Sequence, residues 1–481
     1  MPVANRLGPA KMTPNLFAYL ALALWGPVAL WLYRTRSVSQ ATIWTILGGF
    51  LLLPVGASLK IQGIPSFDKG SIPNLAALAG CMMILRRPSN LWLGLGWPAI
   101  LVVMFLIGPF ITAELNGDPI PVPGLPDAQL PAEGNYDALS AVVSQFFLLL
   151  PFFIGRQALR SAESSVEILR ALVIAGLIYS IPMLFEIRMS PQLHEWIYGY
   201  NPSDFEQEVR AGGYRPIVFL GHGLAMAFFT MTTVVAATAL WRAQTRADRR
   251  LPPAGVTGYL SLMLVFCRSM GSLVYGAALA PLVYFTKARL QVRVALALVS
   301  IALLYPMLRT ANLVPTSSII EFAQSINQDR ADSLKQRFDN EELLLQRASE
   351  RIYFGWGRWG RSRIYNEYGQ DVVRSDGYWV ILLGQFGLFG FLAQFGLLAT
   401  PIFRLVSSLK FARSAHDRIY LGAIALILGI NVFDLLPNAG LRPWTWLLAG
   451  ALLGRTEALR AAVLRPRERV NASPERRAVI N

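Results

Sequence analysis

The chain has 481 residues, of which 54% are hydrophobic and only 15% are charged. An ordinary soluble domain carries roughly a quarter charged residues, so this composition excludes one. The formal net charge of +15 does not indicate a nucleic-acid partner, because Lys and Arg gather in short clusters between apolar stretches, as they do in cytoplasmic loops of membrane proteins.

Apolar stretches that can cross a hydrocarbon core of about 30 Å recur along the whole chain. Clear examples are 16–33, 41–59, 91–111, 216–240 and 378–400. The sequence therefore predicts an all-α polytopic integral membrane protein with about 12–13 transmembrane helices, some of them tilted or broken. We expect a single membrane domain over 1–455 and a basic cytoplasmic tail over 456–481.

Short basic connectors predict which ends of the spans face the cytoplasm. They lie at 34–36, 86–87, 156–160, 242–250, 287–293 and 404–418. The connectors between them must face the other side, and the long ones are 112–137, 186–215 and 309–377. The alternation is weakest at the start, where thirteen spans would place Arg6 and Lys11 outside.

Cysteine and histidine residues are too few and too scattered for a metal centre. Cys81 and Cys267 are the only cysteines, and both lie in or beside apolar stretches. His194, His222 and His416 are well separated in sequence. We therefore expect no disulfide framework, no metal site and no other cofactor.

The loop 186–215 ends in RAGGYRPIVFLGHGLA, which places Arg215 at the mouth of a span expected to start at Pro216. A helix N-terminus beside an Arg is a favourable place for phosphate. His222 would lie about two turns, or roughly 10 Å, deeper on the same face. Both a hydrogen-bonded buried histidine and a functional one fit that position.

The segment CRSMGS carries Arg268 between two apolar stretches on the expected outer side. With its neighbouring Ser and Gly residues, Arg268 could form a small anion-binding turn. A plain hairpin cap explains the pattern equally well.

The loop 309–377 contains apolar residues at helical spacing with charged residues between them. These apolar residues are Leu334, Phe338, Leu345, Ala348 and Ile352. The pattern predicts an amphipathic helix lying on or near the membrane surface.

The segment RIYFGWGRWGRSR follows, with Arg351, Arg358, Arg361 and Arg363 among glycines and aromatics. Guanidinium groups and exposed backbone N–H groups suit a phosphate ligand. Alternatively, the aromatics form an interfacial belt and the arginines contact lipid headgroups.

Asp376 follows Arg374 and stands at the entrance of the span that begins near Tyr378. A carboxylate there could accept a proton from a sugar hydroxyl, and a neighbouring Arg would keep it ionised. Asp at a helix start is also a common N-cap residue, and by itself the pattern favours a cap.

Taken together, the layout of spans, the FGWGRWG segment and SDGYWVILLGQFGLFGF resemble the superfamily of O-antigen ligases and O-antigen polymerases. Ligases of this group carry His, a small polar residue, nine variable positions and Gly-x-x-Gly. Here Asp376 and Gly377 precede nine residues and then Gly387 to Gly390. Because Asp replaces the His of the ligases, the match favours a polymerase over a ligase.

The resemblance implies a membrane glycosyltransferase on the periplasmic face of the bacterial inner membrane. Its substrate would be undecaprenyl-diphosphate-linked oligosaccharide, polymerised into exopolysaccharide or O-antigen. Its partners would be the lipid bilayer, a flippase and chain-length-control proteins. We assign Asp376 to the acceptor hydroxyl and Arg215 to catalysis at the diphosphate. The candidate diphosphate-binding residues are Arg215, Arg268, Arg351, Arg358, Arg361, Arg363 and Arg374.

Three other functions share some of these features. An O-antigen ligase would transfer polysaccharide to the lipid A core. A flippase or other transporter of lipid-linked oligosaccharide would also need arginines, but deep in several spans. A non-catalytic assembly scaffold would favour large coiled-coil outer domains, and none is apparent.

Overall fold

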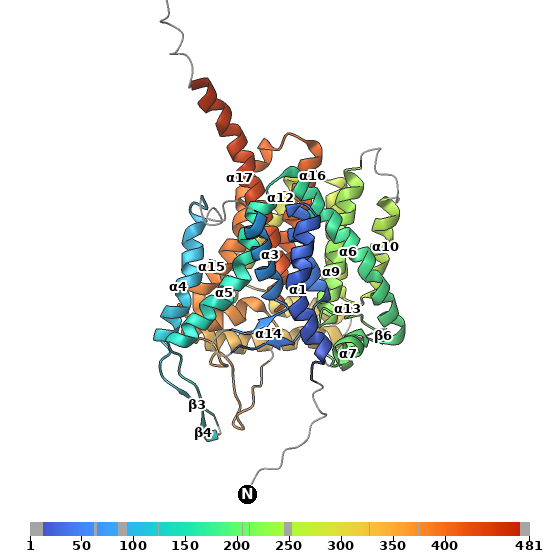
Figure 1. The fold of residues 1–481 in the computed structure, drawn as a ribbon. Coiled ribbons are helices and arrows are strands. Elements are labelled where there is room, and N and C mark those ends of the chain that lie inside the picture. Colours follow the sequence, from blue (N-terminus) through green and yellow to red (C-terminus); the bar gives the residue numbers. More distant parts are fainter. Residues whose placement is uncertain are drawn as a thin grey trace, which may run out of the picture.

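The computed structural model describes residues 13–61, 65–84, 94–123, 125–203, 205–210, 212–244, 253–326, 328–373 and 376–471. Nearly all secondary structure in these ranges is helical (Figure 1). The helices of the first half are α1 Leu16–Thr35, α2 Val38–Leu52, α3 Ile72–Ile84, α4 Pro98–Glu114, α5 Asn135–Ala158, α6 Ala162–Met189, α7 Leu193–Tyr198 and α8 Phe205–Glu208.

The helices of the second half are α9 Gly223–Arg242, α10 Pro253–Phe266, α11 Met270–Phe285, α12 Ala288–Thr310, α13 Thr316–Ile326, α14 Gln328–Ser349, α15 Tyr378–Ser408, α16 Ala415–Asp434 and α17 Pro443–Asn471. A short 3₁₀ turn, η2 Leu409–Phe411, follows α15. Three antiparallel two-stranded ribbons complete the described structure: β1 Ser58–Leu59 with β2 Phe67–Asp68, β3 Ile120–Val122 with β4 Leu125–Leu130, and β5 Val209–Arg210 with β6 Gly213–Tyr214.

Seven described helices are long and apolar enough to cross a membrane: α1, α5, α6, α9, α12, α15 and α16. Five shorter apolar helices accompany them: α2, α3, α4, α10 and α11. The chain is therefore an all-α, multi-pass membrane protein, as its hydropathy indicated. Helix α17 continues to Asn471, so the first part of the expected tail is helical, while 472–481 lie outside the described residues.

Helices α5 and α17 pack unusually closely through two glycines of α17. A Cβ atom at Gly450 would lie 2.0 Å from the carbonyl oxygen of Phe152, and one at Gly454 would lie 2.1 Å from that of Arg156. No larger residue fits at either position. Small residues four apart are a usual means of close helix contact in membranes, where packing rather than water drives association.

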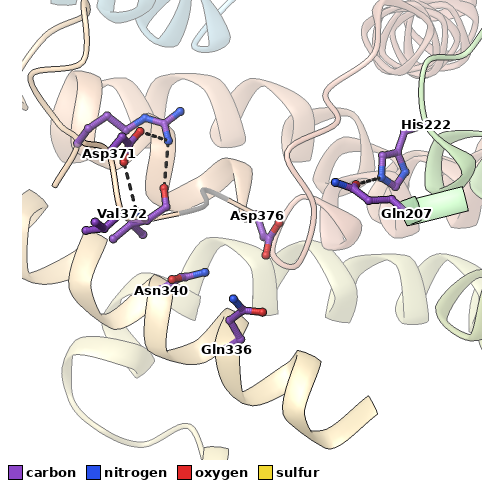
Figure 2. Close-up of a pocket in the computed structure, with 9 residues that line it drawn as sticks. Gln207, His222, Gln336, Asn340, Asp371, Val372 and Asp376 are labelled. Atoms are coloured by element: carbon purple, nitrogen blue, oxygen red, sulfur yellow. Dashed lines mark hydrogen bonds and ion pairs between the residues drawn. The ribbon is translucent and has the colours of Figure 1, made fainter. Parts of the chain in front are cut away.

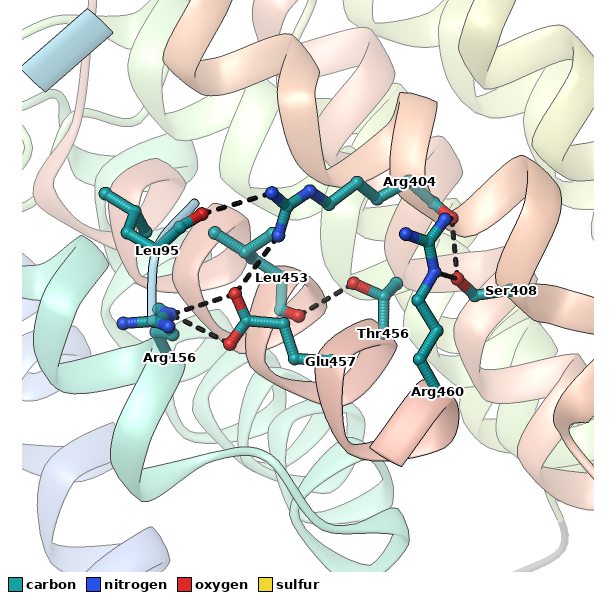
Figure 3. Close-up of polar contacts among 8 residues, drawn as sticks. All are labelled: Leu95, Arg156, Arg404, Ser408, Leu453, Thr456, Glu457 and Arg460. Carbon is teal, nitrogen blue, oxygen red and sulfur yellow. Dashed lines mark hydrogen bonds and ion pairs between the residues drawn. The ribbon is translucent and has the colours of Figure 1, made fainter. Parts of the chain in front are cut away.

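An ion-pair network ties three helices together at the end where α15 terminates (Figure 3). The Glu457 carboxylate on α17 accepts from Arg156 on α5 at 2.9 Å and from Arg404 on α15 at 3.2 Å. Arg404 also donates to the Leu95 carbonyl, and Arg460 donates to Ser408 Oγ at 2.7 Å. Helix α15 begins at the end of the bundle where the candidate site lies and terminates at this network. We call the end that holds the network the opposite end.

Helix α15 is broken at Gly387, whose φ of 63° and ψ of −166° are not helical. The break exposes backbone groups that an intact helix would use internally. Four backbone hydrogen bonds of 2.7 to 3.1 Å join 352–357 to 384–389 across it. The FGWGRWG segment and the GLFG tetrad, far apart in the sequence, are therefore one structural unit.

Helix α14 lies across the bundle in Figure 1, at the end that we call the cavity end. The expected amphipathic helix is present, although it stops at Ser349 and Ile352 lies beyond it. Leu344, Leu345 and Ala348 are buried, and α14 packs against α15. Its apolar side thus faces protein rather than lipid.

Candidate active site

A cavity of about 610 Å³ opens beside α14 at the cavity end (Figure 2). Its size is typical of small-molecule sites. Three sequence-predicted residues, His222, Arg363 and Asp376, come together in its wall. The full lining is Gln207, His222, Gln336, Asn340, Arg363, Asp371, Val372, Val373 and Asp376.

Asp376 presents a half-exposed carboxylate to this cavity. Gly377, not Asp376, is the N-cap residue of α15, so the carboxylate is not used as a helix cap. Its ionic partner is Arg337 of α14, with Nε 3.7 Å from Oδ2. Sequence reasoning missed Arg337, since nothing local to α14 indicates that it meets a residue 39 positions later. The neighbouring Arg374 lies outside the described residues.

The turn that carries Asp376 is held against the connector between α16 and α17. The Tyr378 backbone N–H donates to the Leu435 carbonyl at 2.9 Å. A Cβ at Gly377 would lie 2.5 Å from the Leu436 carbonyl oxygen. Arg337 also donates to the Pro437 carbonyl at 3.1 Å, so one guanidinium braces both the turn and the connector.

His222 is the N-cap residue of α9, which corrects the expectation that this span starts at Pro216. Residues 217–219 are irregular because side chains of α6 accept their backbone N–H groups. Glu186 accepts from Ile217 and Val218, and Tyr179 accepts from Phe219. His222 therefore lies at the mouth of the span and not roughly 10 Å deeper.

The hydrogen bonds of His222 define its tautomer. Nδ1 accepts from the Leu224 backbone N–H at 3.0 Å, which leaves the proton on Nε2, 3.3 Å from Gln207 Oε1. Burial lowers the pKa of His222, although the Glu208 carboxylate 3.9 Å away opposes this. The imidazole is thus a neutral hydrogen-bond donor in the cavity wall.

Arg215 is buried next to this wall. A protein carboxylate already occupies the helix N-terminus at which we expected phosphate to bind beside Arg215. The Glu208 carboxylate accepts from the Gly223 N–H at 3.2 Å and so occupies the N-terminus of α9. Burial lowers the pKa of Arg215, and its Nε has no hydrogen-bond partner among the described residues. Its Nη2 donates to the carbonyl of Arg268 at 3.3 Å, so the two candidate arginines are neighbours.

Arg268 joins the α10–α11 connector to the β5–β6 ribbon. Its backbone has a left-handed φ of 51°, and its Nη1 donates to the Arg210 carbonyl at 2.7 Å. Arg363 lines the cavity beside Asp371, with Nη1 3.2 Å from Oδ2. Of the two, only Arg363 presents its side chain to the cavity.

The remaining arginines of the FGWGRWG region do not line the cavity. They bind other groups of the protein. Arg361 is 1% exposed and donates to the carbonyls of Trp356, Asp118 and Pro131. A buried guanidinium with three carbonyl acceptors stabilises the loop. It is not available to an external phosphate.

Arg351 and Arg358 are likewise engaged. Arg351 donates to Asn116 Oδ1 at 2.8 Å and stacks on Trp356, with 4.3 Å from Cζ to the ring centroid. Arg358 lies over Trp359 at 5.0 Å. Trp356 is buried, so it does not belong to an interfacial belt, whereas Tyr353 and Trp359 are exposed.

The cavity wall offers two carboxylates, a neutral imidazole donor and the guanidinium of Arg363 around one space, with Arg337 paired to Asp376 beside it. Such a set can accept a proton and stabilise developing negative charge. Within the described ranges, no three His, Cys, Asp or Glu side chains are grouped as metal ligands. A comparison with models of known protein families finds no match, and a comparison with curated proteins also finds none.

Proposed function

We propose that this protein is a glycosyltransferase that polymerises undecaprenyl-diphosphate-linked oligosaccharide repeats at the periplasmic face of the bacterial inner membrane. The observation that most supports this proposal is the carboxylate of Asp376 on the cavity wall, free of any capping role. The resemblance of the surrounding motif to O-antigen polymerases supplies the reaction class.

In the proposed reaction, a hydroxyl of the acceptor repeat attacks the anomeric carbon of the lipid-linked donor. The new glycosidic C–O bond forms as the bond from that carbon to the diphosphate oxygen breaks. Asp376 accepts the hydroxyl proton, and undecaprenyl diphosphate leaves with the bonding electrons. Because the diphosphate is already a good leaving group, positioning and charge neutralisation are the main requirements.

The charges around the cavity suit those requirements. Arg337 lies beside the Asp376 carboxylate and balances its charge, and Arg363 is a cation of the cavity lining that can bind diphosphate oxygens. His222 can donate its Nε2 proton in a hydrogen bond while remaining neutral. Arg215 adds positive potential from its buried position, partly offset by Glu208.

Two carboxamides of α14 suit the acceptor sugar. Gln336 and Asn340 are four residues apart, so they lie on one helix face, and both project toward the loop that carries Asp376 (Figure 2). A carboxamide both donates and accepts hydrogen bonds, which matches sugar hydroxyls. This pair would hold the attacking hydroxyl near the carboxylate.

A transporter is less well supported by the distribution of charge. The buried charged side chains in the spanning helices lie near helix ends, for example Arg156 in α5, Glu186 in α6 and Arg309 in α12. A translocation path for a diphosphate would need charges near the middle of several spans.

The deciding experiment reconstitutes purified protein with a polyprenyl-diphosphate oligosaccharide and separates the products on a gel. We expect a ladder spaced by one repeat unit, reduced at least about 100-fold by Asp376→Asn. The matched control is Asp339→Asn, an exposed carboxylate on α14 outside the cavity lining, which should leave the ladder intact.

Two outcomes would contradict the proposal. A normal ladder from Asp376→Asn would remove that carboxylate from the mechanism. No ladder with several donors, together with lipid-linked sugar crossing the vesicle bilayer, would make the protein a transporter.

A further inference from the structure

Helix α13 exposes apolar side chains that no described part of the protein covers. Phe322 is 69% exposed and Ile319 is 39% exposed, three residues apart on one face. The partly buried residues Thr316, Ile320 and Ala323 lie on another face, and α13 packs against α14. An exposed face with a large aromatic residue is costly in water and needs an apolar partner.

That face continues the exposed apolar surface of a helix that can span the membrane. Ile301, Leu304 and Met307 of the spanning helix α12 are 44%, 50% and 65% exposed at a spacing of three residues. Leu313, in the connector from α12 to α13, is 68% exposed. The apolar exposure therefore runs from the span, through the connector, into α13.

The connector has a defined turn that places α13 at the end of the span. Asn312 has a left-handed φ of 54°, the Leu313 N–H donates to the Leu308 carbonyl at 2.9 Å, and the Asn312 N–H donates to that of Arg309 at 3.1 Å. This pair of bonds is the Schellman arrangement that ends a helix. The chain therefore leaves α12 sharply, with little slack before α13.

We propose that α13 lies in the membrane interface, with Phe322 and Ile319 inserted at the boundary between headgroups and acyl chains. The partner is phospholipid, and the contact is apolar rather than electrostatic, because α13 has Glu321 but no Lys or Arg. Insertion therefore needs no anionic lipid. The inference does not depend on the proposed glycosyltransferase activity.

The contact has a consequence for the cavity. Helix α13 packs against α14, and α14 supplies Gln336 and Asn340 to the cavity wall. Anchoring α13 in the interface thus holds the cavity at the level of the membrane surface, where the diphosphate of a polyprenyl lipid lies.

The test places a spin label at Phe322→Cys and, separately, at Gln324→Cys in the full-length protein in phosphatidylcholine nanodiscs. Gln324 is exposed and lies about 160° around the helix from Phe322, which makes it a matched control. The natural Cys81 and Cys267 are buried. Collisions with oxygen report lipid, and collisions with a water-soluble nickel chelate report water.

We expect the ratio of oxygen to chelate accessibility to be severalfold higher at Phe322→Cys than at Gln324→Cys, with Ile319→Cys following Phe322→Cys. High chelate accessibility at both Phe322→Cys and Ile319→Cys would overturn the proposal. So would exclusion of both reagents together with a short distance between labels on two copies, because a second copy of the chain would then cover the face. Polymer synthesis is not part of this readout, so its failure and that of the proposed function are distinguishable.

Discussion

His194 shows how a single buried side chain is fixed in one protonation state. It is 1% exposed in α7, its Nδ1 lies 2.8 Å from the Tyr200 carbonyl, and its Nε2 accepts from the Val55 N–H at 3.3 Å. The ring is therefore neutral, with the proton on Nδ1. Burial is the main cause that lowers the pKa of His194, to about 4 from 6.5, and the nearby Lys69 contributes.

This geometry predicts a loss of stability in acid. Below pH 6.5 the unfolded chain binds a proton at His194 that the folded chain does not bind until about pH 4. The folded state therefore loses stability as pH falls from 6.5, by about 2 kcal/mol at about pH 5. We expect the thermal midpoint in detergent to fall less with pH in His194→Gln than in the wild type.

The control for this prediction is His416→Gln, which changes a histidine that is only partly buried, on α16. Its midpoint should follow the wild-type pH dependence. Equal pH dependence of His194→Gln and the wild type would show that His194 titrates alike in the folded and unfolded states.

At the scale of elements, the break in α15 gives a structural explanation for part of the motif. Gly387 adopts a left-handed φ, and a Cβ there would lie 2.3 Å from the backbone carbonyl of Tyr353. We expect Gly387→Ala to destabilise the protein by about 3 kcal/mol or more, through both backbone strain and overlap. The measurement is the thermal midpoint of the purified protein, with the folded fraction from size-exclusion chromatography.

Gly258→Ala in α10 is the matched control, because no described atom outside its own stretch of helix lies within 4 Å of its Cβ position. That change should be neutral or stabilising by up to about 1 kcal/mol. If Gly387→Ala kept the wild-type midpoint but lost polymer synthesis, Gly387 would instead contact substrate, and the structural explanation would be wrong.

For the whole molecule, short connectors at the two ends of the bundle differ in charge, and this predicts its orientation. At the opposite end, η2, the connector after it and the start of α16 carry Lys410, Arg413 and Arg418, whereas 112–137 at the cavity end has no Lys or Arg. From this difference the positive-inside rule predicts that the cavity faces away from the cytoplasm.

Labelling with a membrane-impermeant maleimide in spheroplasts tests that orientation. Asp339 at the cavity end and Arg413 at the opposite end are both exposed, so cysteine at either site is reachable from its own side. We expect Asp339→Cys to react in intact spheroplasts and Arg413→Cys only after lysis. The reverse pattern would place the cavity in the cytoplasm and exclude a periplasmic polymerase.

Local patterns in the sequence predicted much of the architecture and one part of the site. Span length, basic connectors and the helical spacing in 328–349 are properties of contiguous residues, so they can be read without knowing the tertiary contacts. The position of Asp376 before α15 was predictable for the same reason. The roles assigned to it and to the arginines stay predictions.

Tertiary structure decided which side chains share the cavity and which do not. Arg337 reaches Asp376 only because α14 folds back on α15, and α9 starts at Gly223 only because Glu186 of α6 accepts N–H groups before it. Arg361 is buried and fixes its loop because it donates to a carbonyl group about 240 residues earlier in the chain. The sequence by itself determined which segments are helical, because this depends on local periodicity. Which residues distant in the chain become partners depends on how the helices pack.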